Sequence, residues 1–250
     1  MQYKYETEPQ DYADLASGRV LYSLSGHPAF PVRLASEIFQ RCMAHRETIY
    51  QTSSACTLYD PCCGAAYQLS VLGYLHGKRI QKIIASDIDP KAVDVAKRNL
   101  GLLSTDGFSQ RINEITTMIE QYGKDSHKGA LKSAQVLKKQ ISSLNQEHSI
   151  ITKVFQASAV DKATIHENIQ HNSVDIIFTD VPYGQHSEWQ GADEFSNPLW
   201  SMLDALFDAL SSSSIVAIAS DKAQKVSHEK YQRIEQFQIG KRRVVILKPN

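Results

Sequence analysis

The sequence predicts an α/β protein built on a Rossmann-like, doubly wound sheet that is mostly parallel. Five short, continuous apolar segments indicate buried strands, and helical or turn segments alternate with them along the chain. This order is typical of a sheet whose two faces are both covered by helices. The C-terminal segment instead alternates apolar and polar residues around Gly240, which is typical of a β-hairpin. We therefore expect an antiparallel hairpin at one edge of the sheet.

The expected strands have helices between them. They lie at residues 57–60, 82–87, 151–156, 174–180 and 214–220. Behind the first strand, apolar residues recur at helical spacing from Leu69 to Leu75. Behind the second, Asp89 is placed to cap a helix and Pro90 to occupy its first position. A further helix is expected over residues 198–210.

Two regions fall outside this alternation. Residues 1–55 form an N-terminal extension, in which "PVRLASEIFQRCMAHR" indicates a helix behind a "GHPAF" turn. Residues 104–149 separate the second and third strands and are far longer than a usual crossover. Their apolar spacing predicts a helical insertion of two helices, with the break at residues 122–129. We expect one domain over residues 1–250 that carries both additions.

Composition limits the classes of function and location. Hydrophobic residues make up 42% of the chain and charged residues 22%, as in soluble globular proteins. The formal net charge is zero, so any surface for nucleic acid must be a local patch. Four cysteines, with Cys62 and Cys63 adjacent, form no disulfide framework and fit a reducing compartment. The polar N-terminus and the lack of a long apolar run lead us to expect a cytoplasmic protein with no membrane partner, and we expect a monomer.

The loops after the first two strands indicate a nucleoside site. The first loop is Asp60, Pro61, Cys62, Cys63 and Gly64, and the second is Asp87, Ile88 and Asp89. Ligands of open α/β sheets bind beyond the carboxyl ends of the strands, where an acid such as Asp87 can accept both ribose hydroxyls. A dinucleotide site needs more glycines, and Asp60 would repel phosphate. S-adenosylmethionine fits better, because its amino group and sulfonium are positive. The alternative is a structural turn with incidental acids.

The loop after the fourth strand, "TDVPYG", predicts a clamp for a planar amine. Asp180 can accept one N–H and the Val181 carbonyl a second, while Pro182 makes the loop rigid. Tyr183 offers a face on which an unpaired base could stack. Such a clamp would hold a poorly nucleophilic base amine and stabilise its developing charge. The alternative is a capped turn with a packed tyrosine.

Together, "YDPCCGAA", "ASDIDP" and "TDVPYG" resemble class I S-adenosylmethionine-dependent methyltransferases that act on exocyclic nitrogens of nucleic-acid bases. With "HPAFPVRLASEIFQR" and "PYGQHSEWQG", the chain is more similar still to the AviRa family of ribosomal RNA methyltransferases, associated with avilamycin resistance. The resemblance implies a guanine in 23S ribosomal RNA or a large-subunit precursor as the substrate, and contacts from Ala157 and Ser158 to the cofactor's adenine. Two positions depart from the pattern: the first loop has fewer glycines, and Val181 replaces a usual proline.

Several basic and aromatic residues are candidates for RNA contact. They are Arg33, His186, Trp189, Lys241, Arg242 and Arg243, together with Arg41 and Arg46 on the N-terminal helix. Basic side chains could bind phosphates, although each cluster could equally be a solvated face. We expect no metal, because the histidines show no ligand spacing and adjacent cysteines do not suit one tetrahedral zinc.

Other functions stay open at this level. The same clamp could hold adenine N6, or an amine of a protein or small molecule. A non-catalytic RNA-binding assembly factor could also keep this fold, although the three aspartates argue against it. An oxidoreductase is compatible with the fold alone.

Overall fold

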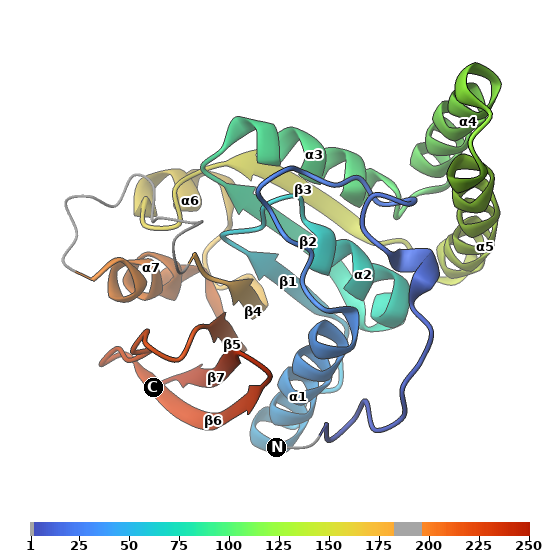
Figure 1. Ribbon diagram of the computed structural model, residues 1–250. Helices are drawn as coiled ribbons and strands as arrows, with labels where there is room; N and C mark the ends of the chain where they lie inside the picture. The colour runs from blue at the N-terminus through green and yellow to red at the C-terminus, as the bar shows by residue number, and fades with distance from the viewer. Residues whose placement is uncertain (1–2, 183–196) are drawn as a thin grey trace.

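The computed structural model describes residues 3–182 and 197–250, and its centre is one seven-stranded sheet (Figure 1). The spatial order of the strands is β3-β2-β1-β4-β5-β7-β6. Their bounds are β1 Cys56–Asp60, β2 Ile80–Asp87, β3 Ile151–Gln156, β4 Val174–Asp180, β5 Leu210–Ser220, β6 Tyr231–Ile239 and β7 Arg242–Pro249.

The pairing of the strands brings three of the predicted loops to one edge of the sheet. Strand β1 pairs in parallel with β2 on one side and with β4 on the other. The loops that follow β1, β2 and β4 therefore leave the sheet side by side, at the switch point where open α/β sheets bind ligands. Strand β7 pairs antiparallel with β5, and β6 with β7. The predicted C-terminal hairpin is thus present, with Gly240 at a positive φ of 61° in its turn.

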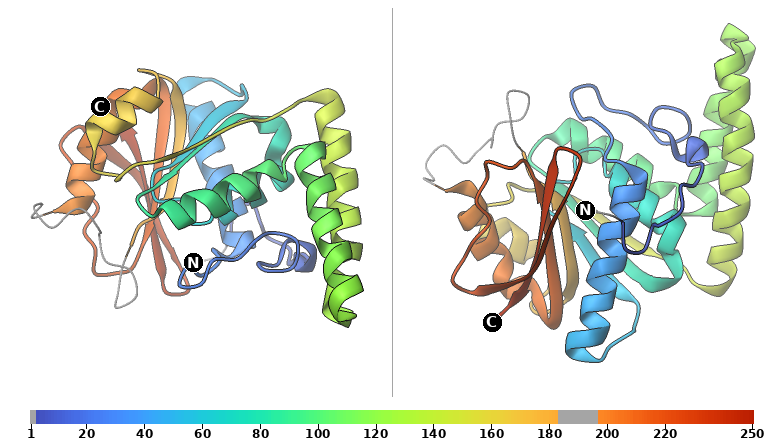
Figure 2. Two further views of the ribbon diagram at one scale, coloured as in Figure 1. Left: turned by 90° about the horizontal axis from the view of Figure 1, so that it is seen from above. Right: turned by 60° about the horizontal axis from the view of Figure 1, so that its bottom comes forward.

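Helices cover both faces of the sheet (Figure 2). Helices α1 (Val32–Tyr50), α2 (Tyr67–His76) and α3 (Pro90–Gly101) contribute to one apolar core, which includes Leu58 of β1 and Phe178 of β4. Helices α6 (Lys162–Asn168) and α7 (Pro198–Leu206) form a second core on the opposite face. Two apolar layers thus hold the central strands rigid, and the loops that they carry have a fixed base.

The insertion between β2 and β3 is a helical hairpin at the side of the sheet (Figure 1). Its helices are α4 (Thr105–Tyr122) and α5 (Asp125–Glu147). The expected break at residues 122–129 is shorter in the structure. Gly123 ends α4 in the left-handed conformation, with a φ of 60°. Helix α5 begins at Asp125, so only residues 123 and 124 separate the two helices.

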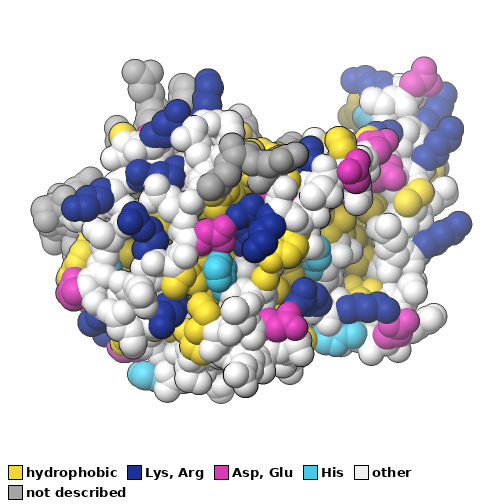
Figure 3. Space-filling view, turned by 90° about the horizontal axis from the view of Figure 1, so that it is seen from below, with side chains coloured by type: hydrophobic (Ala, Val, Ile, Leu, Met, Phe, Trp, Pro, Cys, Tyr) yellow, Lys and Arg dark blue, Asp and Glu magenta, His cyan; other side chains and the backbone are white. Residues whose placement is uncertain are grey.

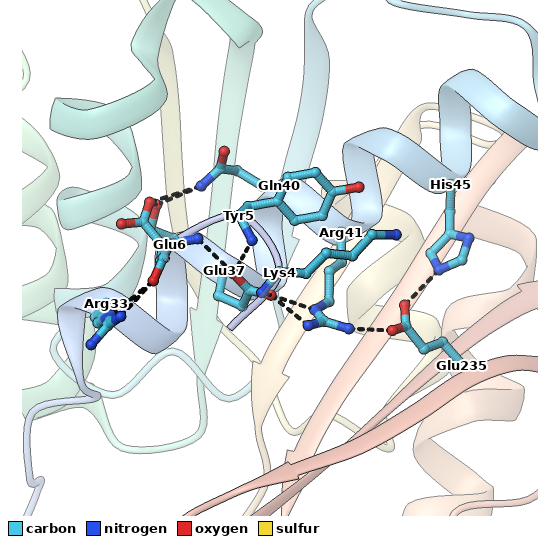
Figure 4. A network of polar contacts seen from close by, with 10 residues as sticks. Lys4, Tyr5, Glu6, Arg33, Glu37, Gln40, Arg41, His45 and Glu235 are labelled. Carbon is cyan, nitrogen blue, oxygen red and sulfur yellow. Dashed lines mark hydrogen bonds and ion pairs between the residues drawn. The ribbon is translucent and has the colours of Figure 1, made fainter. Parts of the chain in front are cut away.

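The N-terminal segment crosses the molecule before α1 begins, and its first described residues are held by hydrogen bonds to one buried glutamate (Figure 4). The Glu37 side chain on α1 accepts backbone N–H groups from Lys4, Tyr5 and Glu6 at 2.8–2.9 Å. Arg41 donates to the same carboxylate at 2.7 Å and pairs with Glu235 of β6. The segment is therefore joined both to α1 and, through Arg41, to the C-terminal hairpin.

Further along, the N-terminal segment packs on α3 and the inserted helices. Asn99 of α3 accepts the backbone N–H of Tyr22 and donates to its carbonyl oxygen. Arg111 of α4 donates to the Val20 carbonyl, and Ser133 of α5 donates to Asp14. The segment then reaches Phe30, whose ring packs edge-on against the ring of Phe178 with 5.5 Å between the ring centroids.

The expected element boundaries differ from the structure at several elements. Helix α1 extends to Tyr50, and helix α6 was not expected, because seven residues carry too little periodicity to be recognised. Strand β5 begins at Leu210 rather than at residue 214, and α7 ends at Leu206. The added residues lie where the pairing of β4 with β5 shifts register, between Leu210 and Ile215. There Ser211 donates to Asp175 and the Ser213 carbonyl accepts from Arg46. No helix of the described residues is both long and apolar enough to cross a membrane.

Candidate active site

A cavity of about 420 Å³ opens where β1, β2 and β4 end. The three strand-end acids, Asp60, Asp87 and Asp180, all line it. The other residues in its wall are Gly26, His27, Pro28, Phe30, Pro61, Cys62, Cys63, Gly64, Ala65, Tyr67, Gln68, Ile88, Asp89, Ser158, Ala159, Val181, Pro182 and Arg242. The three loops that the sequence singled out therefore share one cavity.

Asp60 is the most deeply placed acid of the site, and only 1% of it is exposed. Its carboxylate accepts the backbone N–H of Cys62 at 3.0 Å and the Gln68 side-chain amide at 2.7 Å. Burial raises the pKa of Asp60 to about 7, although these hydrogen bonds oppose the rise. Among the described residues no cation contacts this carboxylate, so its charge is available to a positive ligand group.

The loop after β1 brings backbone close to the cavity. Gly64 adopts a positive φ of 52°, and a Cβ placed there would lie 3.0 Å from the His27 ring. Glycine at 64 therefore avoids both a strained left-handed backbone and a tight contact with His27. Ala66 also has a positive φ of 52°, and α2 begins directly after it, so the N–H groups of its first turn lie beside the loop.

Asp87 is held by backbone rather than by a counter-ion. Gly64 donates its N–H to one oxygen at 2.8 Å, and Asp89 donates its N–H to the other at 3.0 Å. The first bond joins the loops after β1 and β2, and both fix the carboxylate at the mouth of the cavity. The Asp89 side chain itself caps α3 by accepting the Lys91 N–H at 2.9 Å, as its sequence position predicted.

Asp180 ends β4 on the other side of the cavity and faces Arg242 of β7. The Arg242 Nη2 atom lies 3.4 Å from Asp180 Oδ2. Burial raises the pKa of Asp180 to about 6, although the Arg242 charge opposes the rise. The side chain is thus ionised near neutral pH but close to protonation.

The residues after Asp180 are anchored to neighbouring segments. The Val181 N–H donates to the Ala219 carbonyl at 3.0 Å, and its side chain is buried in the second core. The Pro182 carbonyl accepts a hydrogen bond from Gln224 at 2.9 Å. These two hydrogen bonds anchor the backbone at 181–182. The clamp itself stays a prediction, and Tyr183, His186 and Trp189 lie outside the described residues.

The expected adenine contacts divide into two kinds. Ser158 lines the cavity, whereas Ala157 is 5% exposed and donates its N–H to the Asp87 carbonyl. Ala157 therefore supports the second loop from behind instead of facing the cavity.

Burial raises the pKa of the Cys62 and Cys63 thiols well above the usual range, so neither is a thiolate nucleophile. No group of three or more His, Cys, Asp or Glu side chains suited to a metal occurs in residues 3–182 and 197–250.

The candidate RNA-binding arginines of the N-terminal region have structural partners. Arg41 and Arg46 are 5% and 1% exposed, so the expectation that they face RNA is wrong: they pair with Glu37 and Glu235, and with Asp175. Arg33 donates to the carbonyl oxygens of Glu6 and Thr7, and its guanidinium therefore holds the N-terminal segment.

The C-terminal candidates differ from one another. Lys241 is exposed in the hairpin turn, and Arg243 is half-buried. Arg242 lines the cavity itself, which its position in a basic triplet did not indicate. Figure 3 shows Lys and Arg side chains spread over the underside of the molecule, where this hairpin lies.

Sequence reasoning missed several residues that complete the cavity. The N-terminal segment supplies Gly26, His27, Pro28 and Phe30, and α2 supplies Gln68. The "GHPAF" turn was visible in the sequence, but nothing local placed it against strands that follow it by thirty residues or more. Gln68 is recognisable only once its bond to Asp60 is seen.

Comparison with known proteins decides the family. Residues 1–242 match the family model described as rRNA methyltransferase AviRa. The chain belongs to the AviRa family of ribosomal RNA methyltransferases. Among curated relatives, the 23S rRNA (guanine(2535)-N(1))-methyltransferase of Streptomyces viridochromogenes is 34% identical over 98% of this chain and 95% of the relative.

Solved structures agree with this assignment. The rRNA methyltransferase AviRa from Streptomyces viridochromogenes superposes with a TM-score of 0.85 at 34% identity, over 98% of this chain and 96% of that one. TrmN from Thermus thermophilus reaches a TM-score of 0.51 at 13% identity, over 90% of this chain and 51% of that one, and so shows a shared fold only. The predicted fold, the family, a methyltransferase activity and S-adenosylmethionine as cofactor are confirmed.

Proposed function

We propose that this AviRa family member transfers a methyl group from S-adenosylmethionine to N1 of a guanine in 23S ribosomal RNA. The observation that carries the proposal is the convergence of Asp60, Asp87 and Asp180 on one cavity. The identity of 34% over nearly the whole of both chains supports the same substrate as that of the curated relative.

The cavity suits the cofactor at the ends of β1 and β2. Asp87, with its carboxylate already oriented by two N–H groups, would accept the ribose hydroxyls. The buried Asp60 carboxylate would receive the positive amino group, and the backbone of 61–64 would hold the methionine end. Ser158 and Ile88 would lie beside the adenine. The bound cofactor supplies an electrophilic methyl group, and the residues of the chain orient it.

Asp180 would act on the base. The sequence led us to expect an exocyclic amine, whereas the name of the relative specifies the ring nitrogen N1. Guanine N1 carries one hydrogen, which must leave when the nitrogen is methylated. The Asp180 carboxylate can accept this proton, because a pKa raised to about 6 brings it closer to the basicity that a general base needs at neutral pH.

We further propose that residues 1–250 act as a single methyltransferase domain and as a cytoplasmic monomer. The N-terminal extension supplies four residues of the cavity wall, which supports treating it as part of the catalytic unit. The substrate is free 23S RNA or a large-subunit precursor, since ribosomal RNA is what relatives of this family modify by name.

The test is methyl transfer from labelled S-adenosylmethionine into purified ribosomal RNA. We expect label in the 23S fraction and 1-methylguanosine among its nucleosides by mass spectrometry. N2-methylguanosine would return the target to the exocyclic amine, and N6-methyladenosine would change the base. Label in ribosomal protein, or tight RNA binding without any transfer, would contradict the proposal.

A further inference from the structure

We propose that Arg242 recognises O6 of the target guanine and holds the negative charge left on the base when Asp180 removes the N1 proton. This inference rests on the proposed guanine N1 reaction and assigns Arg242 to the base instead of to an RNA phosphate. It concerns a residue at the start of the C-terminal hairpin, far in sequence from the motif loops.

The sheet itself places Arg242 beside Asp180. Asp180 is paired with Ala219 of β5, and Ala219 is paired with Val244 of β7. Arg242 therefore lies two residues before the β7 position that is level with the acid, two strands over with β5 in between. Its Nη2 atom reaches within 3.4 Å of Asp180 Oδ2. Both side chains line the same cavity.

An aromatic ring supports the guanidinium from the other side. The Arg242 Cζ atom lies 4.8 Å from the centre of the Phe30 ring, within the range of a cation–π contact. Phe30 is only 4% exposed and packs edge-on against Phe178 of β4. The guanidinium is thus fixed between a carboxylate and a buried ring, as a group that recognises a ligand must be.

The pair still has unused hydrogen-bonding capacity. Among the described residues, Arg242 Nε and Asp180 Oδ1 are both buried without a partner. The 3.4 Å contact between the two side chains is also long for a charge-assisted hydrogen bond, which is usually 2.7–2.9 Å. Buried donors and acceptors are normally satisfied, so the arrangement indicates a polar ligand that offers an acceptor next to a donor.

The Watson–Crick edge of guanine offers that pair of groups. Its O6 accepts, and the adjacent N1–H donates, so O6 would face Arg242 while N1–H faces Asp180. Adenine presents the reverse order, a donor at N6 and an acceptor at N1, and its N1 lone pair would face the Asp180 carboxylate. A buried site built for one order rejects the other strongly.

The same contact would assist the proton transfer. The N1–H bond breaks, the proton goes to an Asp180 carboxylate oxygen, and the electron pair stays on the base, shared between N1 and O6. The N1 electron pair would then form the bond to the methyl group, while the bond between that methyl group and the cofactor's sulfonium sulfur breaks. The electron pair of the broken bond would return to sulfur, and S-adenosylhomocysteine would leave. The developing charge on O6 lies against the fixed guanidinium, and a preorganised contact of this kind is worth about 10²-fold in rate.

The experiment compares Arg242→Gln and Arg242→Lys with wild type on a 23S RNA transcript. Single-turnover transfer, RNA affinity against salt concentration, and cofactor affinity by calorimetry are measured for each. We expect Arg242→Gln to lose about 10²-fold in rate and Arg242→Lys about 10-fold, because lysine keeps the charge but not the planar fork. RNA salt dependence and cofactor affinity should stay at the wild-type values.

Two controls accompany these variants. Arg79→Gln makes the same exchange directly before β2, at the opposite end of that strand from the cavity, and should transfer at the wild-type rate. In Arg242→Ala, added guanidinium chloride should restore part of the rate, whereas the same concentration of sodium chloride should not. Circular dichroism melting shows whether each variant is folded.

The outcomes separate the possibilities. A wild-type rate in Arg242→Gln with a salt slope lower by about one would make Arg242 a phosphate contact and overturn the inference. A slow variant that also loses cofactor affinity and melts early would make the residue structural, and equally overturn it. Absence of 1-methylguanosine with the wild-type protein would instead refute the proposed function itself.

Discussion

At the scale of single residues, the three strand-end aspartates have different surroundings. Asp60 is buried beside Gln68, Asp87 is oriented by backbone N–H groups, and Asp180 faces an arginine. A buried acid without a cation favours a positive ligand group, an oriented acid favours hydroxyls, and an acid with a raised pKa can take a proton. One residue type therefore serves three roles within one cavity.

Asp87→Ala tests the ribose role. Loss of charge-assisted hydrogen bonds should weaken S-adenosylmethionine binding by about 1.5–3 kcal/mol, measured by calorimetry. Asp94→Ala on α3 is a matched control, because the Asp94 side chain is 77% exposed. Equal cofactor affinity of Asp87→Ala and wild type, with both folded, would move the ribose site elsewhere.

The raised pKa of Asp60 predicts that cofactor binding is linked to the release of a proton. Its pKa of about 7 in the free protein should fall when a positive amino group binds beside it. Binding near pH 6.5 should therefore release a proton, and affinity should rise with pH and level off above about 7. Calorimetry in buffers of different ionisation enthalpy measures this release directly. Asp60→Asn should abolish it, and a release that persists in this variant would assign it to another group.

At the scale of elements, the N-terminal segment depends on Glu37 of α1. Burial acts to raise the pKa of Glu37, but three backbone N–H groups and Arg41 outweigh it and hold the pKa below its usual range. The stabilisation is therefore complete above the ordinary pKa of a glutamate and is lost as the pH falls through the lower, folded-state value. Gly26, His27, Pro28 and Phe30 of the same segment line the cavity. The contacts of Glu37 therefore also help to position this part of the cavity wall.

Glu37→Gln should lower the free energy of unfolding by about 1–3 kcal/mol, the cost of leaving buried donors poorly paired. Urea unfolding at neutral pH measures the loss. Glu47→Gln, at an exposed position near the end of the same helix, should change stability by less than about 0.5 kcal/mol. Equal stability of the two variants would show that the anchor is dispensable.

Apolar runs predicted most strands because the central strands β1, β4 and β5 bury nearly continuous apolar residues, although only Phe155 is buried in the edge strand β3. β3 and β4 coincide with their expected ranges, and the loops after β1, β2 and β4 meet as the parallel order requires. Sequence reasoning failed where the decisive contact is distant. Arg242 reaches Asp180 across β5, and Phe30 reaches the cavity at the end of a segment before α1 whose one described helix is the short 3-10 helix Ala13–Leu15. No local pattern encodes either contact.

At the scale of the whole molecule, a neutral chain has an uneven charge distribution. The formal net charge is zero, yet residues 221–250 contain eight Lys and Arg against three Asp and Glu. Lys222, Lys225, Arg233 and Lys241 are exposed there. Lys222 and Lys225 follow β5 and Lys241 precedes the cavity residue Arg242, whereas Arg233 pairs with Leu247 nearer the other end of the hairpin. A local basic surface formed by the three lysines would attract an RNA backbone without a global positive field.

Replacing Lys225, which follows the Gln224 that binds the Pro182 carbonyl, and Lys241 together by Gln should weaken RNA binding and reduce its salt slope by about two phosphate contacts. Filter binding at several salt concentrations measures the slope. Lys78→Gln is the control, since Lys78 precedes β2 at the end of that strand opposite the cavity and is 70% exposed. A slope identical to that of wild type would make this basic surface a solvated face.

The central claim is that one cavity brings the cofactor and the base together, with Asp180 acting on the base. The most direct measurement is the single-turnover rate of Asp180→Asn on unmodified 23S RNA, together with its affinity for S-adenosylmethionine. Asparagine keeps the shape but cannot take the N1 proton, so the rate should fall by about 10²-fold or more while cofactor affinity changes little. Methyl transfer at the wild-type rate in a folded Asp180→Asn protein would contradict the account.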